Sequence, residues 1–186
     1  RRVEIPEDAP RMIVLPGGNA QFGPIHELLP EKIAVKMCHD PECKRPFVNK
    51  VVTFNATRSD GRLFGQNDRG RITGTGAMML QVHTDEQGEA RALWQLGSDA
   101  GCGNNRVEVT SRDIAGTVLF CASATPAPAR QINIGSGNNQ RAEVGGPAPE
   151  PLRAWVSDSC NGVAGIPVTF RITQGGGKVN GQDSFT

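Results

Sequence analysis

The amino-acid sequence predicts an all-β protein, a two-sheet Greek-key β-sandwich in which one complete module is followed by an incomplete second module. Three observations lead to this expectation. First, no segment shows a sustained helical period of apolar residues. Second, short runs of β-favouring residues are separated by turn residues at the spacing typical of a sandwich. Third, the chain repeats itself, and self-similarity of this kind indicates tandem structural units.

The expected strands of the first module follow from short apolar runs bounded by turns. Val107 and Val109 alternate with polar neighbours, as in a half-buried antiparallel strand. Asp85–Gly88 and Asp113–Gly116 have the Asp-to-Gly signature of tight turns. Seven short strands within about 110 residues are typical of a Greek-key sandwich. The expected strands are Arg11–Leu15, Lys32–Cys38, Lys50–Thr57, Met78–Thr84, Glu89–Leu96, Arg106–Ser111 and Thr117–Ser123.

The repeat predicts the domain organisation. Gly18 matches Gly137 at an offset of 119, and Phe54 matches Phe170 at an offset of 116 after a three-residue difference in one loop. The predicted segments are an N-terminal linker (1–9), a complete module (10–125), a Pro-rich junction (126–129) and the N-terminal part of a second module (130–186). The chain begins at Arg1 with no apolar signal segment, so we expect an excerpt of a longer polypeptide.

The composition argues against two classes of partner. The 20 Lys and Arg residues are balanced by 19 Asp and Glu residues, and no basic run forms a phosphate-binding stripe. The longest apolar runs are far shorter than a membrane span. We therefore expect no nucleic-acid binding and no membrane insertion.

Several segments resemble a known family. Asn161–Phe170, which reads Asn-Gly-Val-Ala-Gly-Ile-Pro-Val-Thr-Phe, follows Glu150–Leu152, and Thr84–Gly97 contains a Thr-Asp-x-x-Gly-x-Ala hairpin. These motifs are similar to those of group 1 bacterial immunoglobulin-like (Big-1) domains of the invasin and intimin type, over nearly the whole of 10–186. The resemblance implies an immunoglobulin-like Greek-key β-sandwich. The chain departs from the family in Cys38–Arg45, a longer loop with cysteines, and in Gln66–Ala77, a polar Gly-rich insertion.

Four of the five cysteines fall in the first module. In an immunoglobulin-like sandwich the first edge strand runs beside the last strand, which would place Cys38 near Cys121 and Cys43 near Cys102. This topology predicts the disulfides Cys38–Cys121 and Cys43–Cys102. Cys160 aligns within one residue of Cys43, so we expect it to be unpaired here or paired outside this segment.

Other arrangements of these thiols remain open. Four cysteines allow three pairings, and the local alternative joins Cys38 to Cys43 and Cys102 to Cys121. A four-thiolate zinc site with His39 is a further alternative, although zinc sites usually contain two tight Cys-x-x-Cys pairs. Disulfides in such a module indicate an oxidising compartment.

No catalytic or cofactor site is predicted. The three histidines, His26, His39 and His83, are too scattered to form a catalytic centre, and no nucleophile-elbow motif occurs. Oxygen-bearing side chains at Asn67-Asp68 and Asp85-Glu86 suggest calcium, but Asp-x-x-Gly is also what an ordinary tight turn requires. We therefore expect a protein that is not an enzyme and that has neither a metal nor a cofactor.

The sequence favours a spacer or adhesion module. Function on β-sandwich scaffolds resides in loops, so the two insertions are the candidate interaction sites. Their candidate residues are His39, Lys44, Arg45, Gln66, Asn67, Asp68 and Arg69. The expected function is that of a non-enzymatic extracellular module in a larger bacterial surface or secreted protein, with neighbouring immunoglobulin-like modules or a host or cell-surface ligand as partners.

Two other functions are compatible with the sequence. A partial module over residues 130–186 would leave strand edges unpaired. Strands from another chain could complete it, which would make the protein an assembly component. Alternatively, the chain could be an accessory domain of a larger secreted toxin or hydrolase.

Overall fold

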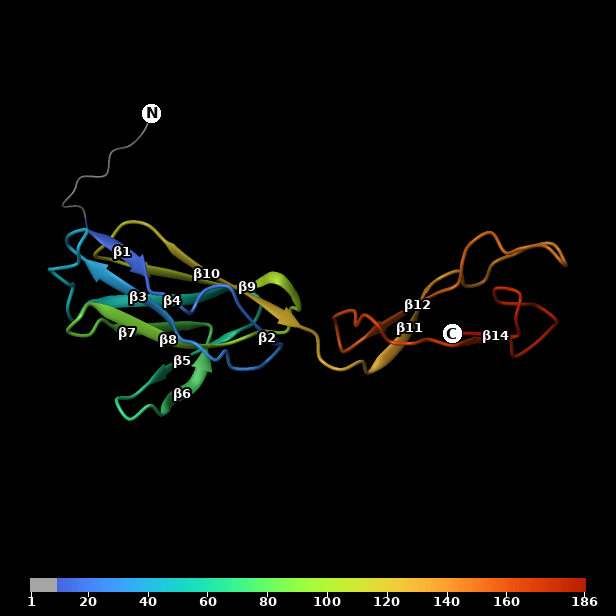
Figure 1. Cartoon of the computed structure of the whole chain (residues 1–186), viewed down its shortest axis with the longest axis horizontal. Helices are drawn as coiled ribbons and strands as arrows, with labels where there is room; N and C mark the ends of the chain where they lie inside the picture. Colours follow the sequence, from blue (N-terminus) through green and yellow to red (C-terminus); the bar gives the residue numbers. More distant parts are fainter. Residues whose placement is uncertain (1–9) are drawn as a thin grey trace, which may run out of the picture. The chain divides into compact units, whose positions relative to one another are not determined.

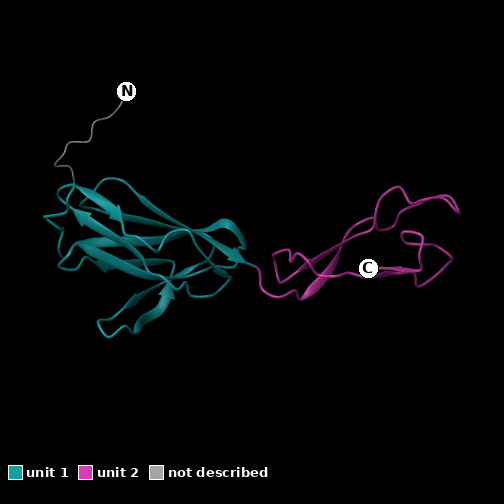
Figure 2. Ribbon diagram, in the orientation of Figure 1, with its two compact units in different colours: residues 1–125 teal, residues 126–186 magenta. Residues whose placement is uncertain are grey.

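The computed structural model describes residues 10–186, so the expected linker 1–9 lies outside the described residues. The chain divides into two compact units, unit 1 (Arg1–Thr125) and unit 2 (Pro126–Thr186) (Figure 2). All regular elements in the described part of the chain are strands or isolated bridges. The all-β prediction is therefore confirmed.

Unit 1 is a sandwich of two five-stranded sheets (Figure 1). One sheet has the order β1-β3-β8-β5-β6 and the other the order β2-β10-β9-β4-β7. The strands are β1 (Arg11–Val14), β2 (Gln21–Pro24), β3 (Ile33–Cys38), β4 (Val51–Arg58), β5 (Arg62–Gln66), β6 (Ile72–Ala77), β7 (Met79–His83), β8 (Glu89–Gln95), β9 (Gly101–Ser111) and β10 (Val118–Thr125). Each of the seven expected strands is present, and β2, β5 and β6 are additional.

Side-chain alternation builds the core of unit 1. In β4 the buried residues are Val52, Phe54 and Ala56, whereas the residues between them are partly exposed. β3 differs, because almost all of its side chains are buried. Trp94 of β8 is 1% exposed and is the largest fully buried side chain. Alternate apolar residues thus meet between the two sheets, as the period of two requires.

The chain changes sheets between β1 and β2. β1 pairs antiparallel with β3, whereas β2 pairs in parallel with β10 in the other sheet. The Gln21 side-chain amide holds this crossing: it donates to the carbonyls of Gly18 and Glu31, both at 2.9 Å, and accepts the Glu31 N–H at 3.0 Å. A Cβ on Gly18 would lie 2.3 Å from the Lys32 carbonyl oxygen, so only glycine fits there.

Unit 2 contains two pairs of strands. β11 (Gln131–Ser136) pairs with β12 (Arg153–Ser157), and β13 (Phe170–Arg171) pairs with β14 (Ser184–Phe185), both antiparallel. The hydrogen bonds of Gln21 recur 119 residues later. The Gln140 amide donates to Gly137 O at 2.8 Å and to Glu150 O at 2.7 Å, and accepts the Glu150 N–H at 2.7 Å. The segment between β1 and β3 in unit 1 and the segment between β11 and β12 in unit 2 are therefore held by the same three hydrogen bonds of a glutamine side chain.

The structure also locates the three-residue difference between the two copies. The Phe47 N–H donates to Met37 O at 2.9 Å, and the Val163 N–H donates to Val156 O at 2.9 Å. Met37 and Val156 differ by 119 positions, whereas Phe47 and Val163 differ by 116. The extra residues of unit 1 therefore lie in the loop that carries Cys38 and Cys43.

Candidate functional site

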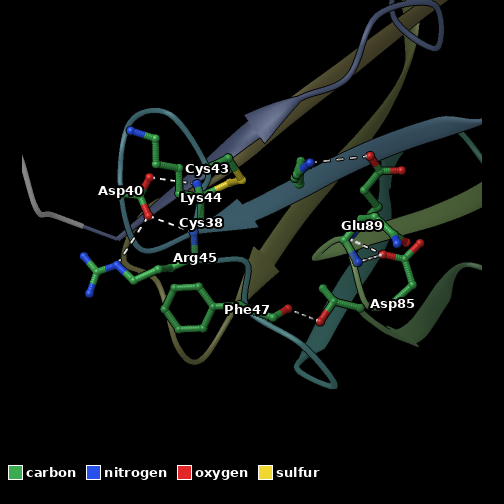
Figure 3. Close-up of a disulfide and its surroundings, with 11 residues drawn as sticks. Cys38, Asp40, Cys43, Lys44, Arg45, Phe47, Asp85 and Glu89 are labelled. Carbon is green, nitrogen blue, oxygen red and sulfur yellow. Dashed lines mark hydrogen bonds and ion pairs between the residues drawn. A yellow bond between two sulfur atoms is a disulfide. The ribbon is translucent and has the colours of Figure 1, made fainter.

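The first candidate surface is the clip loop, which we define as Cys38–Arg45. A disulfide joins Cys38 to Cys43, with their Cα atoms 5.0 Å apart (Figure 3). Inside the loop, the Asp40 carboxylate accepts the N–H groups of Lys44 and Arg45, both at 2.9 Å. The disulfide and this buried carboxylate hold the loop in one shape.

The ionisation of Asp40 reflects these contacts. The hydrogen bond from the Lys44 main chain lowers the pKa of the Asp40 carboxyl, and burial opposes that effect. The Arg45 N–H and the nearby Arg45 guanidinium, whose Nε lies 3.5 Å from Asp40 Oδ2, lower the pKa further. Asp40 is therefore charged at neutral pH, and its carboxylate stabilises the loop by accepting the main-chain N–H groups of Lys44 and Arg45.

The candidate residues of the clip loop differ in their accessibility. His39 stacks on Phe47 with ring centroids 3.7 Å apart, and its main-chain N–H donates to Arg45 O at 2.9 Å. The Lys44 and Arg45 side chains are 78% and 65% exposed. Lys44 and Arg45 can therefore reach a partner, whereas His39 packs against the end of the sandwich.

The predicted disulfides Cys38–Cys121 and Cys43–Cys102 are wrong. The reason lies in the strand order: β3, which ends at Cys38, is an inner strand between β1 and β8, in the sheet opposite β10. The strand parallel to β10 is β2 instead, and the Ala20 N–H donates to Cys121 O. Cys121 therefore lies beside the start of β2, in a different sheet from Cys38.

The three remaining cysteines are free thiols. Cys102 and Cys160 are exposed, and Cys121 is partly buried opposite Arg106. The local alternative is thus correct for Cys38–Cys43, but its second bridge, Cys102–Cys121, is not formed.

Disulfide mapping and reduction will test the clip. We expect non-reducing peptide mapping to join Cys38 to Cys43 and to leave Cys102 alkylatable. Replacing both clip cysteines by alanine should lower the free energy of unfolding by about 2 kcal/mol, because the bridge closes a short loop. Urea unfolding of the oxidised protein, the reduced protein and the double variant measures this effect. Recovery of a Cys38–Cys121 peptide would disprove the assignment.

The second candidate surface is the arm, which we define as residues 62–77. β5 and β6 form this hairpin at the edge of their sheet (Figure 1). The Asn67 side chain shapes its turn by accepting the N–H groups of Arg69 at 3.1 Å and Arg71 at 2.9 Å. The segment 66–77, expected to be a polar Gly-rich insertion, therefore contains a strand and a capped turn.

A polar hollow of about 430 Å³ lies between the turn of the arm and β8. Its polar and charged lining residues are Lys32, Gln66, Asn67, Asp68, His83, Asp85, Glu89 and Arg91. The hollow brings Gln66, Asn67 and Asp68 together with Asp85, the other residue of the calcium interpretation, and with Lys32, Glu89 and Arg91, which the sequence did not nominate. Clip-loop residues do not line it, and neither does Arg69.

The acidic residues of this region have structural partners. Asp85 Oδ1 accepts the N–H groups of Gln87 and Glu89, both at 2.9 Å, as the tight-turn interpretation requires. Glu89 forms ion pairs with Arg91 and with Lys36. Within residues 10–186, no group of three or more His, Cys, Asp or Glu side chains is placed to bind a metal ion.

An apolar hollow of about 340 Å³ lies in unit 2, between the β11–β12 pair and the segment 168–170. Ile132, Ile134 and Leu152 on its lining are 59%, 69% and 51% exposed. The sequence predicted unpaired strand edges in this module. Which edge and which side chains are left open is visible only in the structure.

Sequence reasoning missed the loop caps. Asp158 in unit 2 accepts the N–H groups of Cys160 and Asn161, both at 2.8 Å, and that of Ala127 at 2.9 Å. The bond from Asn161, followed by that from Cys160, holds the pKa of the Asp158 carboxyl far below its ordinary value. An Asp near the start of a tight loop was the available signal, because Asp side chains commonly accept N–H groups two or three residues ahead.

Comparisons with known proteins identify no family. No family model and no curated protein matches the chain. One solved structure that it resembles is described as "Structure of surface layer protein SbsC, domains 4-9", with a TM-score of 0.38 and 10% sequence identity over 94% of this chain. The match spans 26% of that protein's chain. Residues 10–186 contain no helix suited to crossing a membrane.

Proposed function

We propose that the chain is a non-enzymatic spacer from a larger extracellular protein of the bacterial surface or secretome. The observation that carries this proposal is that the chain enters and leaves unit 1 at opposite ends of the sandwich. Arg11, the first residue of β1, pairs with Cys38, the first residue of the clip loop. Thr125, the last residue of β10, lies at the other end of the sandwich, where it pairs with Pro24. The chain enters at one pole and leaves at the opposite pole, as modules joined in series require.

Two further features support an extracellular spacer. The disulfide of the clip loop fits an oxidising compartment. β2 and β10 run in parallel, and the Ala20 and Ile25 N–H groups donate to Cys121 O at 2.9 Å and Thr125 O at 3.0 Å. A pull on the two ends of unit 1 loads these bonds together in shear. We also propose, from the sequence motifs, that unit 1 is an immunoglobulin-like domain of the Big-1 type.

The proposed contact surfaces are the clip loop and the arm. Both are polar insertions on a rigid scaffold, where binding residues are commonly found. The Lys44 and Arg45 side chains are exposed and form ion pairs with Glu42 and Asp40, and the polar hollow offers carboxylates beside Lys32 and Arg91. We propose that these residues of the clip loop and of the polar hollow bind a host or cell-surface ligand.

Single-molecule stretching of the 186-residue chain tests the spacer role. We expect one discrete unfolding event for unit 1, with an extension gain of roughly 35–40 nm for residues 11–125. Reduction of Cys38–Cys43 should lengthen this gain only slightly, because the bridge encloses few residues. Stretching of the chain with no discrete event would show that unit 1 does not resist force, and the spacer role would be abandoned.

A further inference from the structure

The polar hollow beside the arm opens onto an unpaired stretch of β8. β5 pairs with β8 only as far as Phe64↔Leu93. Beyond Phe64 the arm leaves β8, and Gln66 pairs with Ile72 of β6 instead (Figure 1). The arm therefore leaves uncovered the edge of β8 that precedes Leu93, and the hollow lies along this edge.

The main chain of Arg91 faces the uncovered edge. Gly88 O accepts the Met37 N–H at 2.9 Å, and Trp94 O accepts the Leu29 N–H at 2.8 Å, so both carbonyls point toward the side of β3. Main-chain groups alternate in direction along a strand, and those of Arg91 therefore point to the opposite edge. Among the described residues, neither the N–H nor the carbonyl of Arg91 has a hydrogen-bond partner.

The gap in the pairing of β8 is one residue long. On one side of it, Leu93 pairs with Phe64. On the other side, Glu89 O accepts the Asp85 N–H and the Glu89 N–H donates to Asp85 Oδ1, both at 2.9 Å. A peptide strand adds to a sheet edge through a series of main-chain hydrogen bonds, for which this gap is too short. One donor and one acceptor side by side instead suit a small ligand with two neighbouring hydroxyl groups.

The side chains around Arg91 supply further hydrogen-bonding groups that are not in use. Among residues 10–186, no hydrogen bond or ion pair involves the side chains of Lys32, Asp68 or His83, which all line the hollow. Asn67 Oδ1 accepts the N–H groups of the turn, which leaves its Nδ2 as a donor. The two unpaired charges, on Lys32 and Asp68, have opposite signs, so the hollow favours a neutral ligand.

We propose that the polar hollow binds a neutral saccharide. Two neighbouring hydroxyl groups pair with the main-chain N–H and carbonyl of Arg91, and a further hydroxyl donates to the Asp68 carboxylate. Hydroxyl groups both donate and accept hydrogen bonds, and the side chains of Val82 and Leu93 offer apolar contacts to the C–H groups of a sugar ring. The volume of about 430 Å³ lies within the range of small-ligand sites, about 300–1,000 Å³. This inference rests on the contact role proposed above for the polar hollow and specifies the chemical class of its ligand.

NMR titration of the full 186-residue chain with the trisaccharides of glucose, galactose and mannose tests this recognition. We expect at least one of them to shift the backbone amide signals of Arg91 and Asn67 and to leave those of the clip loop unchanged. The affinity should not depend on salt concentration, because the unpaired charges of the hollow cancel. The same trisaccharide with methylated hydroxyl groups is the matched control, and it should not bind because it has no donor for the Arg91 carbonyl.

Two variants at the turn of the arm locate the binding site. Asp68→Ala should weaken binding of that trisaccharide about tenfold, because a hydrogen bond to a charged acceptor is lost. Arg69→Ala is the matched control, because Arg69 is exposed on the same turn but does not line the hollow. Equal midpoints of urea unfolding show that both variants keep the fold. An affinity of Asp68→Ala equal to that of Arg69→Ala would overturn the proposal.

An alanine tripeptide separates failure of this inference from failure of the contact role. If the tripeptide shifts the Arg91 signal and none of the trisaccharides does, the saccharide class is wrong, although the hollow is a contact site. If no probe shifts that signal, both the saccharide class and the contact role of the hollow are overturned. The stretching experiment measures the spacer role independently of either result.

Discussion

Replacing Phe54 by alanine should lower the free energy of unfolding of unit 1 by about 3–5 kcal/mol, whereas Phe170→Ala should cost unit 2 less than about 1 kcal/mol. The two phenylalanines occupy the same position of the repeat. Phe54 is 0% exposed in the core of the sandwich, and its removal leaves a cavity. Phe170 lies partly exposed at the apolar hollow, so water fills the space that it vacates.

The two tryptophans report on the two units separately. Trp94 is buried in unit 1, and Trp155 in unit 2 is 45% exposed. Urea unfolding followed by the fluorescence of Trp94, in a Trp155→Phe background, measures the effect of Phe54→Ala, and Phe54→Leu is the control that keeps most of the volume. The fluorescence of Trp155, in a Trp94→Phe background, measures the effect of Phe170→Ala. Comparable losses for Phe54→Ala and Phe170→Ala would mean that unit 2 also encloses its phenylalanine.

Replacing Asn105 by leucine should destabilise unit 1 by about 3 kcal/mol, although the substitution raises apolarity at a fully buried position. Asn105 is 0% exposed. Its Oδ1 accepts the Gly97 N–H at 2.8 Å, and its Nδ2 donates to Asp99 O at 3.0 Å. Leucine satisfies neither group, and leaving a buried donor or acceptor unpaired costs about 1–3 kcal/mol.

Asn104 is the matched control for Asn105. Its side chain donates a hydrogen bond to Ala100 O at 2.7 Å from a partly exposed position. Asn104→Leu should therefore change the unfolding free energy by about 1 kcal/mol or less. Thermal and urea unfolding compare the two variants. A stability of Asn105→Leu equal to that of the unmodified protein would show that the 97–105 loop is held by other contacts.

The strands that the sequence predicted best are those with a strict period of two. Val52, Phe54 and Ala56 on β4, and Val107 and Val109 on β9, alternate inward with polar neighbours, and all five are buried. The strands that were missed lack this signal. β2 contains a glycine and a proline, and β6 is largely exposed on both faces.

The sequence predicted which segments form the candidate site, but it did not predict how their side chains are arranged in space. The two insertions stand out in the sequence because they interrupt the repeat or the family pattern. That Gln66, Asn67 and Asp68 face Asp85 and Arg91 across the polar hollow depends on the pairing of β5 with β8, between segments about 30 residues apart. No local pattern encodes such a pairing.

The sequence by itself determined that the protein is all-β and that it contains one motif twice, because strand periodicity and self-similarity are local properties of the chain. Only the tertiary structure decided which cysteines pair and which apolar residues are covered. Cys38 does not reach Cys121, because β3 lies inside one sheet and β10 inside the other. Cys38 is joined to Cys43 instead. Phe54 is enclosed and Phe170 is not, because burial depends on strands that arrive from distant parts of the chain. Side chains of β8, β9 and β10 belong to the core around Phe54, whereas Phe170 is only partly buried.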